Sequence, residues 1–141
     1  MENYKDLKVW QEGKEFAKEV YALVKLLPRE ETYALGDQLR RAAVSVPSNI
    51  AEGYGRQSDK DYVHFLKFAR GSLNEVETQL LLAVDFGYLT EEQIAKALSI
   101  ITNEARMLTG LINAVAKRLE AQEKGKKTRG KKEDEDGYES V

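Results

Sequence analysis

The segment "IAKALSIITNEARMLTGLINAVAKRL", residues 94–119, decides the fold class. Its apolar residues recur at alternating steps of four and three, the spacing of an α-helix packed along a left-handed seam against other helices. Thr90 and Gln93 form a capping-box pattern just before it. We therefore predict a helix that begins at Thr90 and ends before Gly125. The apolar positions of this helix are Ile94, Leu98, Ile101, Ala105, Leu108, Ile112, Val115 and Leu119.

Three earlier segments show helical periodicity, and no segment shows the strict alternation that is typical of a half-buried strand. The third helix begins at Ser58 and ends near Gly87. The first covers residues 6–27, where Pro28 ends it, and the second covers residues 35–53. Short connections make consecutive helices antiparallel neighbours. The sequence thus predicts an all-α fold, an antiparallel up-down-up-down four-helix bundle.

The second helix contains Pro47 and ends in two glycines, Gly53 and Gly55. Pro47 lacks the amide that would bond to the Ala43 carbonyl, so we expect a bend there, at a local cost of about 3 kcal/mol. The two glycines supply the backbone freedom to leave the helix. We interpret these three residues as a structural joint rather than a substrate site, whose polar stripe meets another helix or subunit. That stripe consists of Arg41, Ser45, Ser48 and Glu52.

The chain divides into a bundle, residues 1–122, and a charged tail, residues 123–141. The tail is basic and then acidic, with almost no apolar residues, so we expect it to be disordered. It acts either as a solubilising tail or as an electrostatic arm that touches a polyanion. The first residues lack the apolar core of a signal peptide, and no apolar run is long enough to span a membrane. We therefore expect a cytoplasmic protein without a membrane partner.

The residues that usually carry enzymatic chemistry are scarce. There is no cysteine, which excludes disulfides, thiolate metal sites and cysteine nucleophiles. His64 is the single histidine, and no Glu stands three residues before it, as the metal sites of four-helix bundles require. No glycine-rich phosphate loop is present. We expect neither an enzyme nor a bound metal, cofactor or small-molecule substrate.

A basic stripe follows the outer side of the third helix. At 100° per residue, its members fall within an arc of about 120°, opposite the apolar face. Such a stripe suits a phosphate backbone. The other interpretation is the plain solvated face that any bundle helix needs. The stripe comprises Arg56, Lys60, His64, Lys67 and Arg70.

Four ordered motifs together resemble the four-helix bundle proteins of the 23S rRNA intervening-sequence family. They are "YKDLKVWQEG" near the start, "QLRRAAVSVPSNIAEGYGR" in the second helix, "FLKFARGSLNEVETQL" in the third and "DFGYL" in the following turn. The resemblance covers residues 4–119, nearly the whole bundle. It implies a bacterial protein that assembles as a homopentamer and has no known catalytic activity.

A similar branch of that family comprises the accessory variability determinants of diversity-generating retroelements, which bind a reverse transcriptase and nucleic acid through basic surfaces. The basic positions that match by resemblance are Arg40, Arg41, Arg56, Lys67 and Arg70. Lys60 joins them from the stripe. The resulting hypothesis is a non-enzymatic, oligomeric accessory factor that associates with RNA or ribonucleoprotein. The alternative is a protein-interaction scaffold that binds no nucleic acid.

Overall fold

The computed structural model describes the backbone of residues 3–139 and the side chains of residues 3–126. Its long helices are α1 (Lys8–Val24), α2 (Leu35–Tyr54), α3 (Asp59–Asp85) and α4 (Glu91–Glu139). Two short 3₁₀ turns, Tyr4–Asp6 and Arg29–Glu31, precede α1 and α2. Within the described backbone there is no strand, so the prediction of an all-α fold is confirmed.

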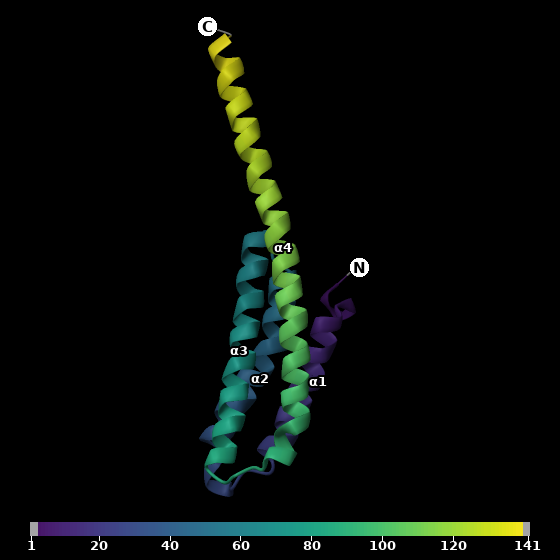
Figure 1. Cartoon of the computed structure of the whole chain (residues 1–141), viewed down its shortest axis with the longest axis vertical. Coiled ribbons are helices and arrows are strands. Elements are labelled where there is room, and N and C mark those ends of the chain that lie inside the picture. The colour runs from purple at the N-terminus through teal and green to yellow at the C-terminus, as the bar shows by residue number, and fades with distance from the viewer. Residues whose placement is uncertain (1–2, 140–141) are drawn as a thin grey trace.

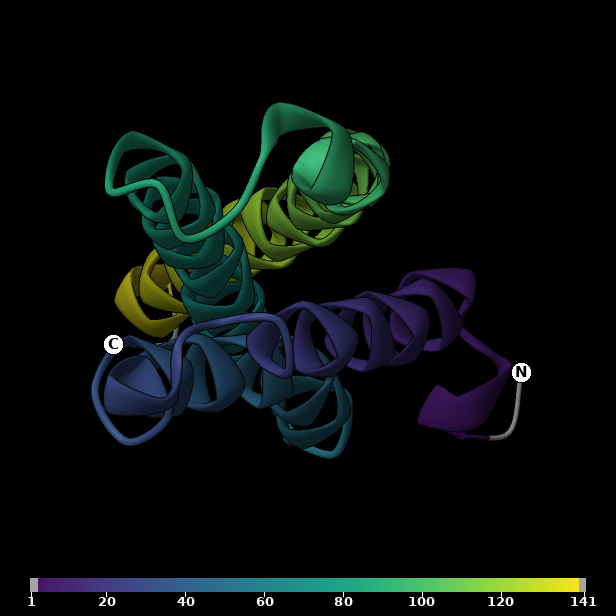
Figure 2. The same ribbon diagram turned by 90° about the horizontal axis from the view of Figure 1, so that it is seen from below.

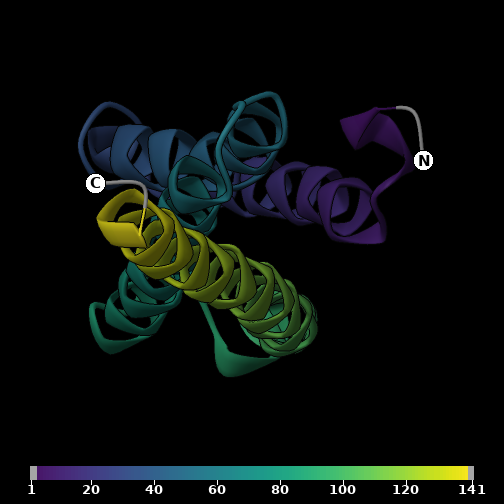
Figure 3. The same ribbon diagram turned by 90° about the horizontal axis from the view of Figure 1, so that it is seen from above.

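The four helices alternate in direction, and each packs against the next along the chain (Figure 1). α1 also contacts α4, which closes the bundle, although this contact is the least extensive of the four. Seen along the long axis, the helices are tilted relative to one another, and the start of α1 lies far to one side, away from α3 (Figures 2 and 3). The predicted up-down-up-down bundle is therefore present, with α1 as its most peripheral member.

The helix boundaries follow the local signals in the sequence. At the start of α4, the Gln93 amide donates to Thr90 Oγ1 at 3.1 Å and the Thr90 amide donates to Gln93 Oε1 at 2.9 Å, which confirms the capping box. Ser58 Oγ likewise accepts from the Asp61 amide at 3.1 Å and caps α3. α3 ends at Asp85, and Gly87, two residues further on, has φ +78°, a left-handed conformation that favours glycine.

The structure assigns Gly53 a different role from the one the sequence predicts. Gly55 has φ −78°, and Gly87 is the one residue of the described backbone with a clearly positive φ. Gly53 is buried instead against α3: a Cβ built on it would lie 2.8 Å from Phe65 Cβ and 3.0 Å from Tyr62 Cδ1. It is therefore the close approach of α2 to α3, rather than backbone freedom, that requires a glycine at this position.

α2 continues as helix through Pro47. Near the proline, Asn49 Nδ2 donates to the Ser45 carbonyl at 2.8 Å and to Ser45 Oγ at 2.7 Å, and the Ser45 and Ser72 hydroxyls lie 2.9 Å apart. Ser45 belongs to the polar stripe that the sequence places on this helix. Ser45 thus meets another helix, α3, through the Ser72 hydroxyl, whereas the other three members of the stripe are exposed.

The backbone of the charged segment after residue 122 continues α4 as far as Glu139, where the sequence predicts a tail without order. Lys, Arg, Gln and Glu are good helix formers, and a helix that already exists extends more readily than a new one nucleates. Figure 1 shows this part of α4 projecting beyond the ends of the other helices. Residues 140 and 141 and the side chains after 126 lie outside the described residues.

The core contains one acidic residue that the apolar periodicity does not place there. On α4, Glu104 is completely buried, whereas the neighbouring Ala105 is only half-buried. The buried positions Ile101, Glu104 and Leu108 are separated by steps of three and four, as a core stripe requires. Glu104 therefore occupies a core position although its side chain is acidic.

Candidate nucleic-acid interface

The six basic residues singled out in the sequence come from α2, from the connection after it and from α3. Arg40 is tied to its own end of the bundle, since its Nη2 donates to the Thr32 carbonyl at 2.9 Å and pairs with Asp37. These contacts fix the turn between α1 and α2. Arg41, one residue on, is exposed and lines a shallow hollow of about 440 Å³ with Tyr21 and Val44.

Arg56 lies in the connection between α2 and α3. Its Nη2 is 2.7 Å from Glu52 Oε1, and its guanidinium carbon lies 4.8 Å from the centre of the Phe65 ring. The ion pair offsets part of the Arg56 charge, while the ring contact orients the guanidinium plane. Arg56 is therefore a positioned cation at the edge of α3.

Arg70 faces α4 rather than the outer side of α3. It is half-buried, and its Nη1 lies 3.5 Å from Thr109 Oγ1. Lys60 and Lys67 are exposed, and no ion pair of theirs is found among the described side chains. Of the predicted stripe, these two lysines are the cations that α3 presents to solvent without a described acidic partner.

Aromatic side chains accompany the two lysines on α3. The His64 and Phe68 rings meet edge to face at a centroid distance of 4.5 Å, and the Phe68 side chain is 52% exposed. The ring centroids of Phe65 and Phe68 are 6.3 Å apart. We call Lys60, His64, Lys67 and Phe68 the outer face of α3. It combines positive charge with an accessible aromatic ring.

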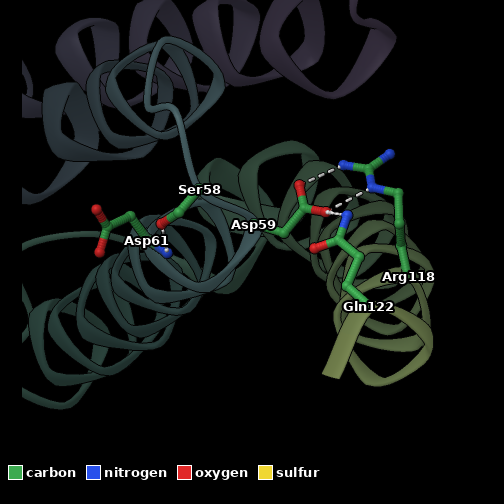
Figure 4. Close-up of polar contacts among 5 residues, drawn as sticks. All are labelled: Ser58, Asp59, Asp61, Arg118 and Gln122. Carbon is green, nitrogen blue, oxygen red and sulfur yellow. Dashed lines mark hydrogen bonds and ion pairs between the residues drawn. The ribbon is translucent and has the colours of Figure 1, made fainter. Parts of the chain in front are cut away.

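A polar cluster for which the sequence gives no signal lies where α4 passes the start of α3 (Figure 4). Arg118 donates to Asp59 through two bonds of 2.7 Å, from Nε and Nη2, and Gln122 Nε2 donates to the same carboxylate at 3.2 Å. The bond from Arg118 holds the pKa of Asp59 below its usual range. No local signal links residues 59 positions apart, so only the fold could reveal this pair.

A hollow of about 760 Å³ opens beside that cluster, and Lys60 and Lys126 line it together with Glu123. Because Arg118 binds Asp59 through two parallel hydrogen bonds, the cluster serves chiefly to hold α4 against α3. Lys60 belongs to both the hollow and the outer face of α3. The cluster thus holds in place the end of α3 that carries Lys60.

Side chains of residues 3–126 bring no three histidine, aspartate or glutamate groups into a metal-binding arrangement. None of the helices, as far as they are described, combines the length and apolar character that crossing a membrane demands.

Comparisons with known proteins give one family and one fold. Residues 5–110 match the family described as 23S rRNA-intervening sequence protein. Among solved structures, the chain is similar to a crystal structure from Bacteroides thetaiotaomicron VPI-5482, described as a protein with unknown function from the S23 ribosomal protein family. The two chains are 28% identical with a TM-score of 0.69, over 74% of this chain and 97% of the other. The comparison with curated proteins found no match.

Proposed function

Because this chain belongs to the 23S rRNA-intervening sequence protein family, we propose that it is a non-enzymatic, oligomeric accessory protein that binds RNA through the outer face of α3. The observation that carries the proposal is the pairing of two solvent-facing lysines, Lys60 and Lys67, with the half-exposed ring of Phe68. The family name associates its members with an rRNA gene, and an RNA partner fits that association.

Charge and aromatic surface have separate roles in this proposal. The ammonium groups of Lys60 and Lys67 neutralise phosphates and release counterions, which supplies affinity without sequence preference. Phe68 offers a ring on which an unpaired base can stack, worth about 1–3 kcal/mol per base. His64, in contact with Phe68, supports the ring edge.

Assembly is proposed on a different surface, since the family resemblance implies a homopentamer. α1 and α2 carry exposed apolar side chains that a monomer would leave in water, among them Tyr21 at 42% and Val44 at 42% exposure. Burial of these side chains between subunits would keep the outer face of α3 accessible. Light scattering at micromolar concentration tests assembly directly, and a monomer would contradict it.

A charge-reversal experiment tests the RNA proposal. The variant Lys60→Glu/Lys67→Glu is titrated with a structured RNA that contains single-stranded loops, at several salt concentrations. We expect a loss of affinity of tenfold or more and a salt slope reduced by about 1 to 2, because two phosphate contacts are removed. Lys8→Glu/Lys117→Glu is the matched control, since it changes the net charge equally at two other exposed lysines.

The outcomes distinguish RNA binding at the outer face of α3 from non-specific attraction and from the absence of RNA binding. Equal losses in both double variants would indicate non-specific attraction and overturn the assignment to α3. Absence of binding by the wild type at low salt would reject RNA binding altogether. Phe68→Leu should weaken binding to single-stranded RNA, whereas Phe86→Leu, at an exposed phenylalanine just after α3, should not.

A protein-interaction scaffold is the second candidate, and a specific surface favours it. Leu81, Leu82 and Phe86 are exposed at or just after the C-terminal end of α3, and Leu81 also lines a hollow of about 410 Å³ between α3 and α4. A protein partner, such as the reverse transcriptase of the retroelement branch, would bury these side chains. Loss of partner binding in Phe86→Asp together with absence of RNA binding would favour this function.

A further inference from the structure

Glu104 is the acidic group that the bundle buries most completely. Its residue exposure is 0%, and neither carboxyl oxygen has a hydrogen-bond partner among the described residues. The carboxyl group lies at the meeting of three helices. A Cβ built on Gly13 of α1 would be 2.8 Å from Glu104 Oε2 and 3.5 Å from the Cβ of Pro47 in α2. Only a glycine leaves room for the carboxyl group at this point of α1.

A carboxylate in this position would be very costly in its charged form. Removal of an ion from water costs several kcal/mol unless hydrogen bonds or an opposite charge compensate. Burial therefore raises the pKa of the Glu104 carboxyl to about 8, and Glu12 of α1 adds to the rise through like-charge repulsion. The neutral acid is the form that the closed bundle accepts at neutral pH.

The charged surroundings of Glu104 provide no compensation. Glu12 faces it from α1, and Arg106 lies with Glu12 around a shallow hollow on the outer side of the α1–α4 contact. No basic group from α2, α3 or α4 lowers the pKa of the carboxyl group among the described residues. A proton on Glu104 is therefore what keeps the centre of the bundle uncharged.

We propose that Glu104 is a proton-controlled latch between α1 and α4: α1 is packed while the buried carboxyl group holds its proton, and α1 opens locally when the proton is lost. The α1–α4 contact is the natural place for such an opening because it is the least extensive helix contact of the bundle. Its one described ion pair joins Lys96 and Glu19 at 3.6 Å, with the lysine 75% exposed. An ion pair exposed to this degree contributes little to the stability of the α1–α4 contact.

Proton linkage gives the proposal a direction. In the open state Glu104 faces water and has an ordinary carboxyl pKa, so opening releases a proton whenever the pH lies between that value and the raised one. The equilibrium constant for opening therefore rises about tenfold per pH unit from about pH 4.5 to about pH 8, and then levels off. Low pH closes the latch and mildly alkaline pH releases it.

Hydrogen exchange resolved by residue tests the latch. In the full-length wild type, the opening constants of α1 amides, corrected for intrinsic exchange, should rise about fiftyfold between pH 6 and pH 8. The isosteric Glu104→Gln variant should show no such rise. Glu92→Gln is the matched control, since Glu92 is exposed on the same helix, and it should behave as the wild type.

The amides of α2 and α3 provide an internal comparison. If their opening constants rise with pH as steeply as those of α1, the opening is global and the latch is rejected. A flat α1 profile in the wild type, or an equal rise in Glu104→Gln, rejects it as well. Should Glu104→Gln not fold, Glu104→Met, neutral and of similar length, must give the same flat profile.

Trp10 supplies a second readout, because it is the single tryptophan of the chain and lies on α1. Quenching of its fluorescence by acrylamide should increase between pH 6 and pH 8 in the wild type and remain constant in Glu104→Gln. An equal increase in both proteins would contradict the proposal.

Discussion

The α2–α3 and α1–α4 interfaces bury polar groups in opposite ways. Between α2 and α3, the hydroxyls of Ser45 and Ser72 lie 2.9 Å apart, and Gln79 Nε2 donates to Gln38 Oε1 at 3.2 Å. Between α1 and α4, the Glu104 carboxyl group has no described partner. Both interfaces bury polar side chains, but only between α2 and α3 do the buried side chains hydrogen-bond from one helix to the other.

The two interfaces differ in the charge of the unpaired buried group more than in its polarity. Gln79 Oε1 also lacks a partner, yet it belongs to a neutral amide whose nitrogen makes two hydrogen bonds. A neutral group in this situation costs about 1–3 kcal/mol, whereas an unpaired carboxylate costs far more. α2 and α3 therefore form the firm half of the bundle, and the α1–α4 contact depends on a proton.

An acidic residue introduced into the α2–α3 interface should have the largest effect on the stability of the bundle. Gln79→Glu removes two donated hydrogen bonds and places a carboxyl group beside Glu75 Oε1, which now lies 3.3 Å from Gln79 Nε2. We expect the free energy of unfolding at pH 8 to fall by about 3–5 kcal/mol. Urea denaturation measures it, with Asn74→Glu on the exposed side of α3 as the control. Equal effects of the two variants would contradict the comparison.

Removal of the acidic group at Glu104, in the α1–α4 interface, should instead raise the stability of the bundle at alkaline pH. Since the pKa of Glu104 is raised to about 8 in the folded state, its stabilising contribution is full below about pH 4.5 and lost as the pH rises toward 8. The wild type should lose at most about 4 kcal/mol of unfolding free energy between pH 5 and pH 8. Glu104→Gln should lose much less in the same urea experiment. Parallel pH profiles for both proteins would show that other groups dominate.

Two glycines of the α2–α3 pair should respond in opposite directions to a methyl group. Gly53→Ala places a Cβ 2.8 Å from Phe65 Cβ, so overpacking should cost about 1–3 kcal/mol. Gly71→Ala on α3 meets nothing within 4 Å and should stabilise the protein by up to about 1 kcal/mol through its helix propensity. Thermal unfolding of the two variants measures both. Destabilisation by Gly71→Ala would show that this face of α3 is covered, for example by another subunit.

The ion pair on the surface of the α1–α4 contact should matter least. Lys96 Nζ is 3.6 Å from Glu19 Oε2, and the Lys96 side chain is 75% exposed. Lys96→Ala should change the unfolding free energy by less than about 1 kcal/mol, and salt should remove most of that change. A larger loss in urea denaturation at low salt would mean that this pair, rather than the proton on Glu104, holds α1 in place.

The helices themselves could be predicted because their signals are local. The Thr90 and Gln93 capping box and the Ser58 cap act across three residues, and each is present as predicted. α1 ends at Val24, three residues before the end at residue 27 that the sequence predicts from Pro28, whereas Gly87 lies just beyond the end of α3 at Asp85, as its backbone preference requires. Antiparallel packing of neighbours follows from the short connections.

The candidate site could be predicted only in part. Lys60 and Lys67 lie on the exposed side of α3 as the helical projection places them. Arg40, Arg56 and Arg70 carry the same charge in sequence, but each has a described partner in the structure: Asp37, Glu52 or Thr109. A projection gives the direction of a side chain from its own helix and says nothing of the neighbour it meets.

The sequence by itself determined the number, type and direction of the helices, since periodicity, caps and chain breaks are interactions within a few residues of one another. The tertiary structure alone decided that Glu104 is buried without a partner, that Gly53 serves close packing, and that Arg118 binds Asp59. Each of these depends on the crossing of two helices far apart in the chain. The energy of a buried polar or charged group is set by what lies opposite it, and that is a property of the packed bundle.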